Sequence, residues 1–195
     1  KQFKGQKDIE KDIELLSSQV ERCNEILKRL TLNPVEEDEF IDKDLTMREY
    51  LSEIISSFKE ISKKQFILNY DQDSNNKKIT KSIEIVYGLR NFIGNANKFS
   101  KSTVYINLKS DSEITEIIIE DDGSGYPRDI LPKIGEPYLN SNNPQEKSNK
   151  GLGLGLFIGK NLLEKNFASI ICRNSKTRSG AEVIIKWKNR DLFNI

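Results

Sequence analysis

The chain has 195 residues, 36% of them hydrophobic and 31% charged, a composition typical of a soluble globular domain with an appended segment. Its 31 basic and 30 acidic residues leave a net charge of +1, a balance that gives no sign of a nucleic-acid or anionic-membrane surface, so no nucleic-acid partner is expected. Histidine is absent, which excludes serine–histidine and cysteine–histidine catalysis and histidine-ligated metals within these residues.

Residues 1–33 carry a heptad pattern that predicts one long amphipathic helix. Its apolar positions recur in steps of four and three, and they are Ile9, Ile13, Leu16, Val20, Cys23, Leu27 and Leu30. Asn33-Pro34 ends the helix, because the residue before a proline is pushed out of the α region. A lone helix of this kind is marginal in water, so we expect it to be half of a dimerising hairpin. The alternative is a helix packed on its own domain.

Residues 34–45 are acidic and aperiodic and are predicted to be a linker, and residues 46–195 are predicted to form one domain. Thr46 followed by Glu49 predicts a capping box at the start of a helix through Phe58. The next helix is expected at 79–99, with an apolar face made of Ile83, Val86, Leu89, Ile93 and Ala96.

The remaining elements complete an α+β pattern. Strands are expected at 65–70, 104–108, 114–120, 168–173 and 181–187, and a helix at 155–165. Residues 126–150 are rich in Pro, Asn, Ser and Lys, and a loop of that length in a compact domain is usually functional or disordered. The order predicts a two-layer α/β sandwich, with helices on one face of a mostly antiparallel sheet.

The first motif that carries chemistry is Asn91-Phe-Ile-Gly-Asn95-Ala-Asn-Lys98-Phe99. Asn91, Asn95 and Lys98 are spaced four and three residues apart and therefore share one helix face. Burying unpaired amides and a charge is costly, so such a face requires partners. Amide oxygens are suitable ligands for a Mg²⁺ ion that also binds phosphates. A lysine one helical turn further on would contact the same phosphates through its positive charge. The alternative is a solvated helix face.

The second motif, Asp121-Asp122-Gly123-Ser-Gly125, directly follows a predicted strand. Glycines at such a place allow the backbone to approach a flat ligand closely. A carboxylate at the strand end can accept a hydrogen bond from an exocyclic amine such as that of adenine. Alone the motif is weak, because an acidic glycine turn is also a common hairpin signal.

The third motif, Lys150-Gly-Leu-Gly-Leu-Gly155, runs into the predicted helix 155–165. Alternating glycines expose successive backbone N–H groups, and the start of the helix adds a favourable anion site. The spacing matches neither the Walker A loop nor the dinucleotide fingerprint. The alternative is a glycine-rich segment used for tight packing.

In this order the three motifs resemble the N, G1 and G2 boxes of the histidine-kinase branch of the ATPase/kinase superfamily with the Bergerat nucleotide-binding fold. Ile134-Gly-Glu-Pro-Tyr138 lies where that family has its F box, and Gly180 falls where a final glycine box begins the last strand. The resemblance extends from residue 46 to about residue 188. It implies a Bergerat-type sandwich and protein histidine kinase activity with ATP and Mg²⁺.

The resemblance also implies a role for each matching residue. Asn95 would ligate Mg²⁺, with Asn91 beside it at the phosphates and Lys98 contacting phosphate, as the catalytic set. Asp121 would hold the adenine amine, and Gly123 and Gly125 would shape the base pocket. The other implied nucleotide contacts are Phe99, Lys150, Gly151, Leu152, Gly153, Leu154 and Gly155. Residues 126–150 would be the ATP lid.

The N-terminal helix narrows the resemblance. The segment 19–27, around Cys23, is similar to the second dimerisation helix of the RegB/PrrB group of redox-responsive sensor kinases, in which a cysteine here is a redox-sensitive thiol. The heptad puts Cys23 on the seam, where two chains could bring like thiols together; the alternative is a small core residue. Cys172 lies in an alternating strand and is expected to be packed. Two cysteines so far apart favour free thiols.

One substitution separates a kinase from the hydrolases of the same superfamily, the gyrase, Hsp90 and MutL type. Those enzymes place a glutamate four residues before the Mg²⁺ asparagine to activate water. Here that position is Asn91, and an amide is no general base near neutral pH. Transfer to a positioned acceptor requires little beyond alignment and charge neutralisation. The alternatives are a nucleotide-responsive pseudokinase or docking module, and a serine-kinase relative.

The resemblance implies partners outside the chain. They are a phosphoacceptor histidine on the missing first helix of the hairpin, a second copy joined through residues 1–33, and a response regulator. The absence of histidine predicts that this chain alone does not autophosphorylate. The chain does not begin with Met, and we expect a cytoplasmic piece of a protein anchored in the inner cell membrane.

Overall fold

The computed structural model describes residues 45–71, 78–79, 82–137 and 154–193. The chain divides into two units, residues 1–42 and 43–195, and every described residue belongs to the second. The predicted dimerisation helix with Cys23, and residues 150–153 of the third motif, lie outside the described residues. Within the described part, no helix is long and apolar enough to cross a membrane.

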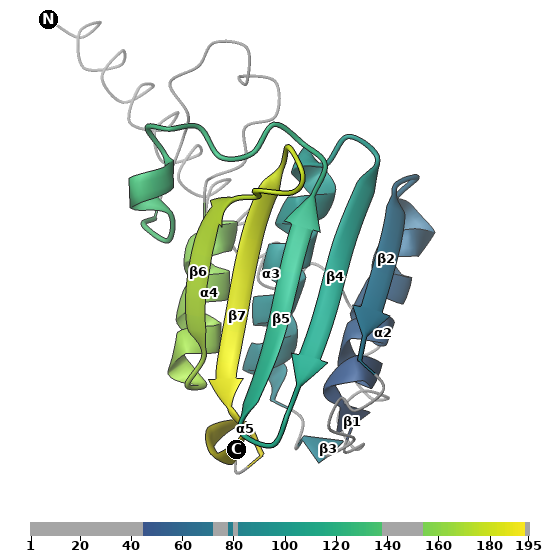
Figure 1. Ribbon diagram of the computed structural model, residues 1–195, viewed down its shortest axis with the longest axis vertical. Coiled ribbons are helices and arrows are strands. Elements are labelled where there is room, and N and C mark those ends of the chain that lie inside the picture. The colour runs from purple at the N-terminus through teal and green to yellow at the C-terminus, as the bar shows by residue number, and fades with distance from the viewer. Residues whose placement is uncertain (1–44, 72–77, 80–81, 138–153, 194–195) are drawn as a thin grey trace, which may run out of the picture. The chain divides into compact units, whose positions relative to one another are not determined.

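Five strands form the main sheet, in the order β2-β4-β5-β7-β6 (Figure 1). They are β2 (Gln65–Tyr70), β4 (Thr103–Ser110), β5 (Ile114–Asp121), β6 (Ser169–Asn174) and β7 (Ala181–Lys188). Strand β2 is parallel to β4, and the other neighbours are antiparallel. The expected mostly antiparallel sheet is therefore confirmed.

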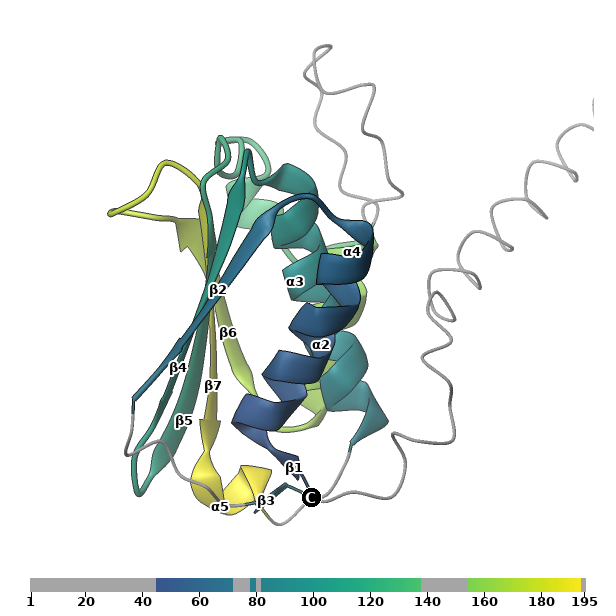
Figure 2. The ribbon, with the colours of Figure 1, turned by 90° about the vertical axis from the view of Figure 1, so that its right-hand side faces the viewer.

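Three helices cover one face of this sheet, as the side view shows (Figure 2). They are α2 (Met47–Ile61), α3 (Ile83–Phe99) and α4 (Gly155–Lys165), and short segments η1 (Leu131–Lys133) and α5 (Asn189–Leu192) complete the helical elements among the described residues. The predicted capping box is present, since the Glu49 N–H donates to Thr46 Oγ1 at 3.3 Å and the Thr46 N–H donates to Glu49 Oε2 at 2.7 Å. The predicted two-layer sandwich is confirmed for this domain.

The core lies between the helices and the inner face of the sheet. Alternate strand residues point into it, and they include Val104, Ile106, Ile117, Ile119, Ile185 and Trp187. The helices contribute Leu51, Leu89 and Ile93, all fully buried. This pattern follows from the period of two along a half-covered strand and the wider stripe of an amphipathic helix.

Two expectations about the second helix are wrong. Helix α3 begins at Ile83 after the N-cap Ser82, and Ile79 instead pairs with Leu45 in a small sheet of β1 (Leu45–Thr46) and β3 (Lys78–Ile79). Leu45 therefore belongs to a strand and not to the linker. Ile83 is 56% exposed because it occupies the first turn of the helix, while Ile85 and Phe92 are buried in the core.

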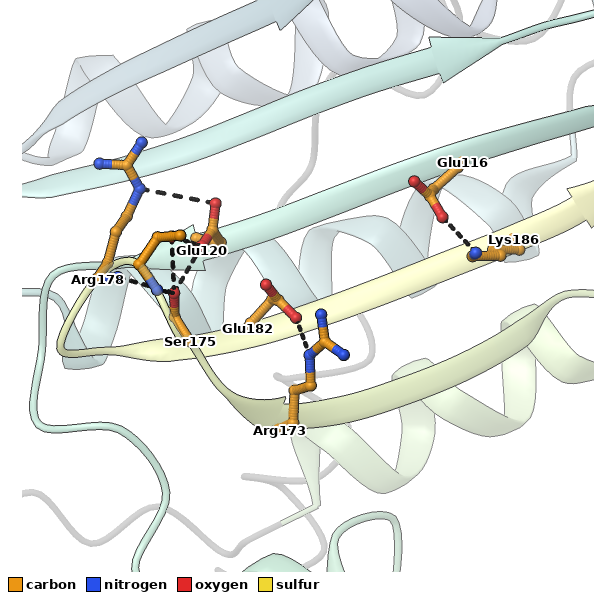
Figure 3. Close-up of polar contacts among 8 residues, drawn as sticks. Glu116, Glu120, Arg173, Ser175, Arg178, Glu182 and Lys186 are labelled. Atoms are coloured by element: carbon orange, nitrogen blue, oxygen red, sulfur yellow. Dashed lines mark hydrogen bonds and ion pairs between the residues drawn. The ribbon is translucent and has the colours of Figure 1, made fainter.

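On the outer face of the sheet, charged side chains of neighbouring strands and of the β6–β7 hairpin form ion pairs (Figure 3). Near the middle of the sheet, Lys186 and Glu116 lie 2.5 Å apart. Toward the end of β5, Glu120 meets Arg178 at 3.6 Å, and the Arg178 guanidinium stacks 3.4 Å from the ring centre of Tyr105. Figure 3 shows Glu116 and Lys186 on neighbouring strands, and Glu120 on β5 beside Arg178 in the turn between β6 and β7.

Candidate nucleotide site

Helix α3 presents the first motif along its C-terminal half. Asn91 and Asn95 are half-buried and Lys98 is exposed, with its Nζ 5.2 Å from the centre of the Phe99 ring. The Asn91 amide nitrogen donates to the carbonyl of Tyr87 at 2.8 Å, one helical turn earlier, which orients the amide and leaves its oxygen for another partner. The predicted shared helix face is therefore present.

Helix α4 crosses α3 at very short range because glycines face each other there. A Cβ atom added to Gly159 would lie 3.0 Å from the Asn91 Cβ and 3.2 Å from the Gly88 carbonyl oxygen. A Cβ at Gly88 would lie 2.5 Å from the side chain of Leu163. Side chains at the contact usually keep two packed helices about 8–10 Å apart. Here the glycines have no side chains, and the two helices approach more closely.

The close crossing brings the start of α4 to the first motif. The Cβ position of Gly155, the first residue of α4, is 3.5 Å from the Asn91 amide oxygen. The N-terminus of a helix carries partial positive charge and free N–H groups, which makes it suitable for phosphate. An amide oxygen and an anion-attracting helix end therefore lie side by side.

Asp121 ends β5 in a buried position, with 3% of its surface exposed. Burial raises the pKa of its carboxyl group, and the backbone N–H groups of Gly123 and Ala181 act in the opposite direction by donating to it. The Gly123 N–H lies 2.8 Å from Asp121 Oδ1. A carboxylate held this way retains lone pairs for a ligand amine.

Two glycines pack backbone against backbone around this carboxylate. A Cβ at Gly180 would lie 2.0 Å from the Asp121 carbonyl oxygen, and a Cβ at Gly123 would lie 2.3 Å from the Phe99 carbonyl oxygen. Neither contact leaves room for a side chain. The second contact also joins the end of α3 to the second motif.

Asp122 ties the second motif to the turn that follows α3. Its carboxylate accepts hydrogen bonds from the N–H groups of Lys101 at 2.7 Å, Ser102 at 3.0 Å and Thr103 at 3.1 Å, and from the Ser102 hydroxyl at 2.5 Å. Burial acts to raise the pKa of Asp122, but these bonds outweigh it and hold the pKa well below the usual carboxyl range. Hydrogen bonding to the charged form is thus the dominant effect.

Lys64 holds the C-terminal end of α3. Its Nζ donates to the carbonyl oxygens of Asn97, Ser100 (2.6 Å) and Lys98 (3.3 Å). A cation there satisfies carbonyls that have no partner within the helix and complements the helix dipole. The end of α3 that carries the predicted phosphate contacts is therefore fixed from two sides, by Lys64 and by the Asp122 turn.

Helix α3 carries the first motif and contacts the other two. Its middle meets Gly155 through Asn91, its end meets Gly123 through Phe99, and Asn95 lies on the helix between these two contacts. Leu154, the N-cap of α4, is buried, while Lys150, Gly151, Leu152 and Gly153 lie outside the described residues.

Two further glycines of the predicted motifs have a positive φ, and Cys172 is packed. Gly125 has a φ of +75° and Gly135, within the expected F box, has a φ of +95°, both in the region that favours glycine. Cys172 packs against the core, as expected, and burial raises the pKa of its thiol to about 11.

Sequence reasoning missed Gly88, Gly159 and Asn174. The two glycines stand inside predicted helices, where a glycine is unfavourable unless packing requires it, and that was the available signal. Asn174 gave no local signal, because its partner Tyr126 lies 48 residues away in the sequence.

Comparison with known proteins identifies the family. Residues 80–191 match the family described as histidine kinase-, DNA gyrase B- and HSP90-like ATPase. The match covers more than half of the chain, and the chain therefore belongs to this family. Membership implies that the domain binds ATP.

The sequence relatives are sensor histidine kinases. The chain is 32% identical over 172 residues to sensor histidine kinase RegB of Cereibacter sphaeroides, an alignment covering 84% of the chain and 37% of RegB. It is also 33% identical over 82 residues to sensor protein KdpD of Clostridium acetobutylicum, covering 41% of the chain and 9% of KdpD. The chain thus spans little more than a third of RegB, and the domain is of the sensor histidine kinase type.

Solved structures share the fold. The mycobacterial sensor histidine kinase MprB superposes with a TM-score of 0.60 at 19% identity, over 73% of this chain and 93% of MprB. Full-length ShkA in complex with AMPPNP gives 0.61 at 17% identity, over 74% of this chain and 30% of ShkA. At these identities the likeness establishes the fold alone.

Proposed function

We propose that this domain binds ATP with Mg²⁺ and transfers the γ-phosphate to a histidine outside the chain, from which it passes to an aspartate of a response regulator. One observation carries the proposal: in the middle of α3 the Asn91 amide oxygen lies 3.5 Å from the Cβ position of Gly155, while the C-terminal end of the same helix contacts Gly123. These contacts support a site in which the groups suited to metal, phosphate and base lie along α3 and its immediate neighbours.

In this proposal each described residue has one task. The Asp121 carboxylate accepts a hydrogen bond from the adenine amine, which its burial and remaining lone pairs favour. Asn95 supplies an amide oxygen to Mg²⁺, Asn91 stands beside it, and Lys98 contacts phosphate. When bound, Mg²⁺ neutralises phosphate charge and aligns the transferred group.

The third motif completes the phosphate contacts in this proposal. Gly155 and Leu154 stand at the positive end of α4. The glycines 151 and 153, with Lys150 and Leu152, would add backbone N–H groups, and Phe99 would border the nucleotide where α3 ends.

Phosphotransfer is favoured over hydrolysis because the side chain at the position of a water-activating glutamate is the Asn91 amide. Its nitrogen already donates to the Tyr87 carbonyl, so the group is held as an orienting amide and has no basic lone pair to take a proton from water. The docking-module alternative is not favoured, since the curated relatives are kinases.

The direct test supplies the missing acceptor. The full chain is incubated with γ-labelled ATP and Mg²⁺ together with a separately produced phosphoacceptor hairpin. We expect acid-labile label on the hairpin, none on the chain alone, and loss of transfer in Asn95→Ala. Label appearing on the isolated chain, or transfer unchanged by Asn95→Ala, would refute the proposed mechanism.

Redox control through Cys23 is a second part of the proposal, suggested by the RegB similarity. An oxidant is expected to produce a dimer on non-reducing gels that Cys23→Ser abolishes. Cys172→Ser is the matched control, because burial raises the pKa of that thiol to about 11 and leaves little reactive thiolate near neutral pH. Dimer formation that persists in Cys23→Ser would remove the redox role.

Anchoring of the parent protein in the cell membrane, with this domain in the cytoplasm, is likewise proposed.

A further inference from the structure

We propose that Asn174, the last residue of β6, is a positioning residue of the nucleotide site. Its side chain holds the Gly125–Tyr126 backbone and so fixes the turn that carries the adenine-recognising motif. The inference rests on the proposed nucleotide site and assigns a residue outside the three motifs to it.

The Asn174 amide binds both polar groups of one residue. Its Oδ1 accepts from the Tyr126 N–H at 2.6 Å, and its Nδ2 donates to the Tyr126 carbonyl at 3.0 Å. Only an amide side chain offers an acceptor and a donor side by side in this way. The contact imitates one rung of an antiparallel ladder, in which two residues exchange both of their backbone bonds.

Gly125 is adapted to this contact in two ways. Its φ of +75° is one that other residues rarely adopt. In addition, a Cβ there would lie 2.7 Å from Asn174 Oδ1 and 3.0 Å from its Cγ. The second glycine of the motif therefore makes room for the Asn174 amide, a requirement independent of any ligand.

One cross-strand pair of β6 and β7 holds both ends of the turn 121–126. Asn174 and Ala181 are cross-strand partners. The Ala181 N–H donates to the Asp121 carboxylate at the start of the turn, and Asn174 binds Tyr126 at its end. Gly180, next to Ala181, touches the Asp121 carbonyl. The turn 121–126 is thus set by one pair of residues on the neighbouring hairpin.

The hairpin is itself anchored on the outer face of the sheet, through Glu120 (Figure 3). The Ser175 hydroxyl donates to Glu120 at 2.8 Å, and Arg178 lies 3.6 Å from the same carboxylate. The Ser175 N–H also donates to the Gly180 carbonyl at 2.9 Å and closes the hairpin. Glu120 directly precedes Asp121, so the anchor and the carboxylate that it positions are neighbours on β5.

Strand β6 also holds the Tyr126 side chain. Cys172, two residues before Asn174 and therefore on the same strand face, packs with Tyr126 against the core. Burial raises the pKa of the Tyr126 phenol well above its ordinary value, so the ring stays neutral. Backbone and ring of Tyr126 are therefore fixed by Asn174 and Cys172, which lie two residues apart on one face of β6.

The test compares Asn174→Ala with Asn107→Ala in the full chain. Asn107 Oδ1 accepts an exposed hydrogen bond from the Asn69 amide nitrogen at 2.9 Å on the outer face, and Asn107 serves as the matched control. Loss of the two bonds at Asn174 is expected to weaken AMPPNP·Mg²⁺ binding about 3- to 10-fold in calorimetry. In transfer to a supplied hairpin, the KM for ATP rises by the same factor while kcat stays unchanged. Asn107→Ala leaves both constants as in the wild type.

A double-mutant cycle keeps the inference testable if one variant folds poorly. Gly125→Ala is expected to harm binding less in the Asn174→Ala background, because the clash with the amide is gone. Asn174→Asp retains the acceptor and loses the donor, and an intermediate loss is expected. Wild-type affinity in Asn174→Ala, with only a lower Tm, overturns the inference and leaves the proposed function standing. A wild-type chain that binds no AMPPNP overturns both.

Discussion

The two ends of the central strand β5 use polar residues differently. At its start, the polar groups bind one another: the Thr115 hydroxyl donates to Asn189 Oδ1 at 2.7 Å, and the Asn189 amide nitrogen donates to the Asp111 carbonyl at 2.8 Å. At its end, Asp121 is equally buried but is bound by backbone N–H groups and approached by glycines. The first arrangement holds the fold together. The second packs backbone closely around a buried carboxylate, which retains lone pairs for a ligand in the proposed site.

The largest effect is expected where backbone touches backbone. Gly180→Ala inserts a Cβ at 2.0 Å from the Asp121 carbonyl oxygen. Because the clash is with backbone, no change of side-chain rotamer can relieve it. We expect a loss of about 2–3 kcal/mol in the free energy of unfolding and loss of measurable AMPPNP binding. Urea denaturation and calorimetry measure the two quantities.

Gly94→Ala is the matched control for Gly180. Gly94 lies within α3, and its added Cβ would lie 3.2 Å from the tip of the Phe58 ring of α2, a side chain that can shift slightly where backbone atoms cannot. Because alanine is favoured over glycine inside a helix by about 1 kcal/mol, the stability should stay near or slightly above that of the wild type. Equal destabilisation by both variants would show that the Gly180 contact is not special.

The next effect concerns the carboxylate itself. Asp121→Asn keeps the volume but replaces a charged acceptor, so we expect roughly 10- to 100-fold weaker AMPPNP binding with little change in Tm. Asp111→Asn is its counterpart at the other end of β5, where the carboxylate accepts the Glu113 and Ile114 N–H groups, both at 2.7 Å. That variant should bind AMPPNP as the wild type does; weakened binding there would contradict the division between the two ends.

A smaller effect concerns pH and Asp122. The hydrogen bonds that lower its pKa stabilise the charged form in the folded state. Its contribution to stability is therefore fully present above the ordinary carboxyl pKa of about 4 and is lost as the pH falls below that value. We expect Asp122→Asn to lower the free energy of unfolding by about 1 kcal/mol at pH 7, since solvent screens this partly exposed group. Urea titrations at pH 7 and pH 3 should differ less for the variant than for the wild type. An unchanged pH dependence would assign the acid sensitivity elsewhere.

The smallest effect is expected at the Glu116–Lys186 pair. Lys186→Met removes one partner of a partly exposed ion pair, for which the expected loss is below about 1 kcal/mol, and AMPPNP affinity should not change. Glu120→Gln, on the same face next to Asp121, should reduce affinity measurably because it loosens the hairpin. If Lys186→Met reduced AMPPNP affinity as strongly as Glu120→Gln, the contacts of Glu120 with the β6–β7 hairpin would have no specific effect on the site.

Local patterns were enough to predict most of the fold. The capping box at Thr46 and Glu49 is present, and the helix 155–165 begins and ends where the pattern indicated. The start of α3 was misplaced because Ile79 belongs to a two-residue strand whose partner, Leu45, is 34 positions earlier. A strand of two residues is too short to show the alternation of apolar and polar residues by which a strand is predicted.

The candidate site was predictable only in its parts. The spacing of Asn91, Asn95 and Lys98 gave a shared face from sequence alone, and their roles stay predictions. The close crossing at Gly88 and Gly159, and the contact of Asn174 with Tyr126, depend on which elements become neighbours. Those neighbours are fixed by the sheet order, which no local motif encodes.

Convergence of the three motifs on one triphosphate is tested most directly by paramagnetic broadening. AMPPNP with Mn²⁺ in place of Mg²⁺ is titrated into the ¹⁵N-labelled chain, and amide signals are followed by residue. We expect the signals of Asn95 and Gly155 to broaden first, while those of Thr115 and Asn189 at the other end of the domain persist. Broadening that spares Asn95 or Gly155, or that affects Thr115 equally, would contradict a single site built from these motifs.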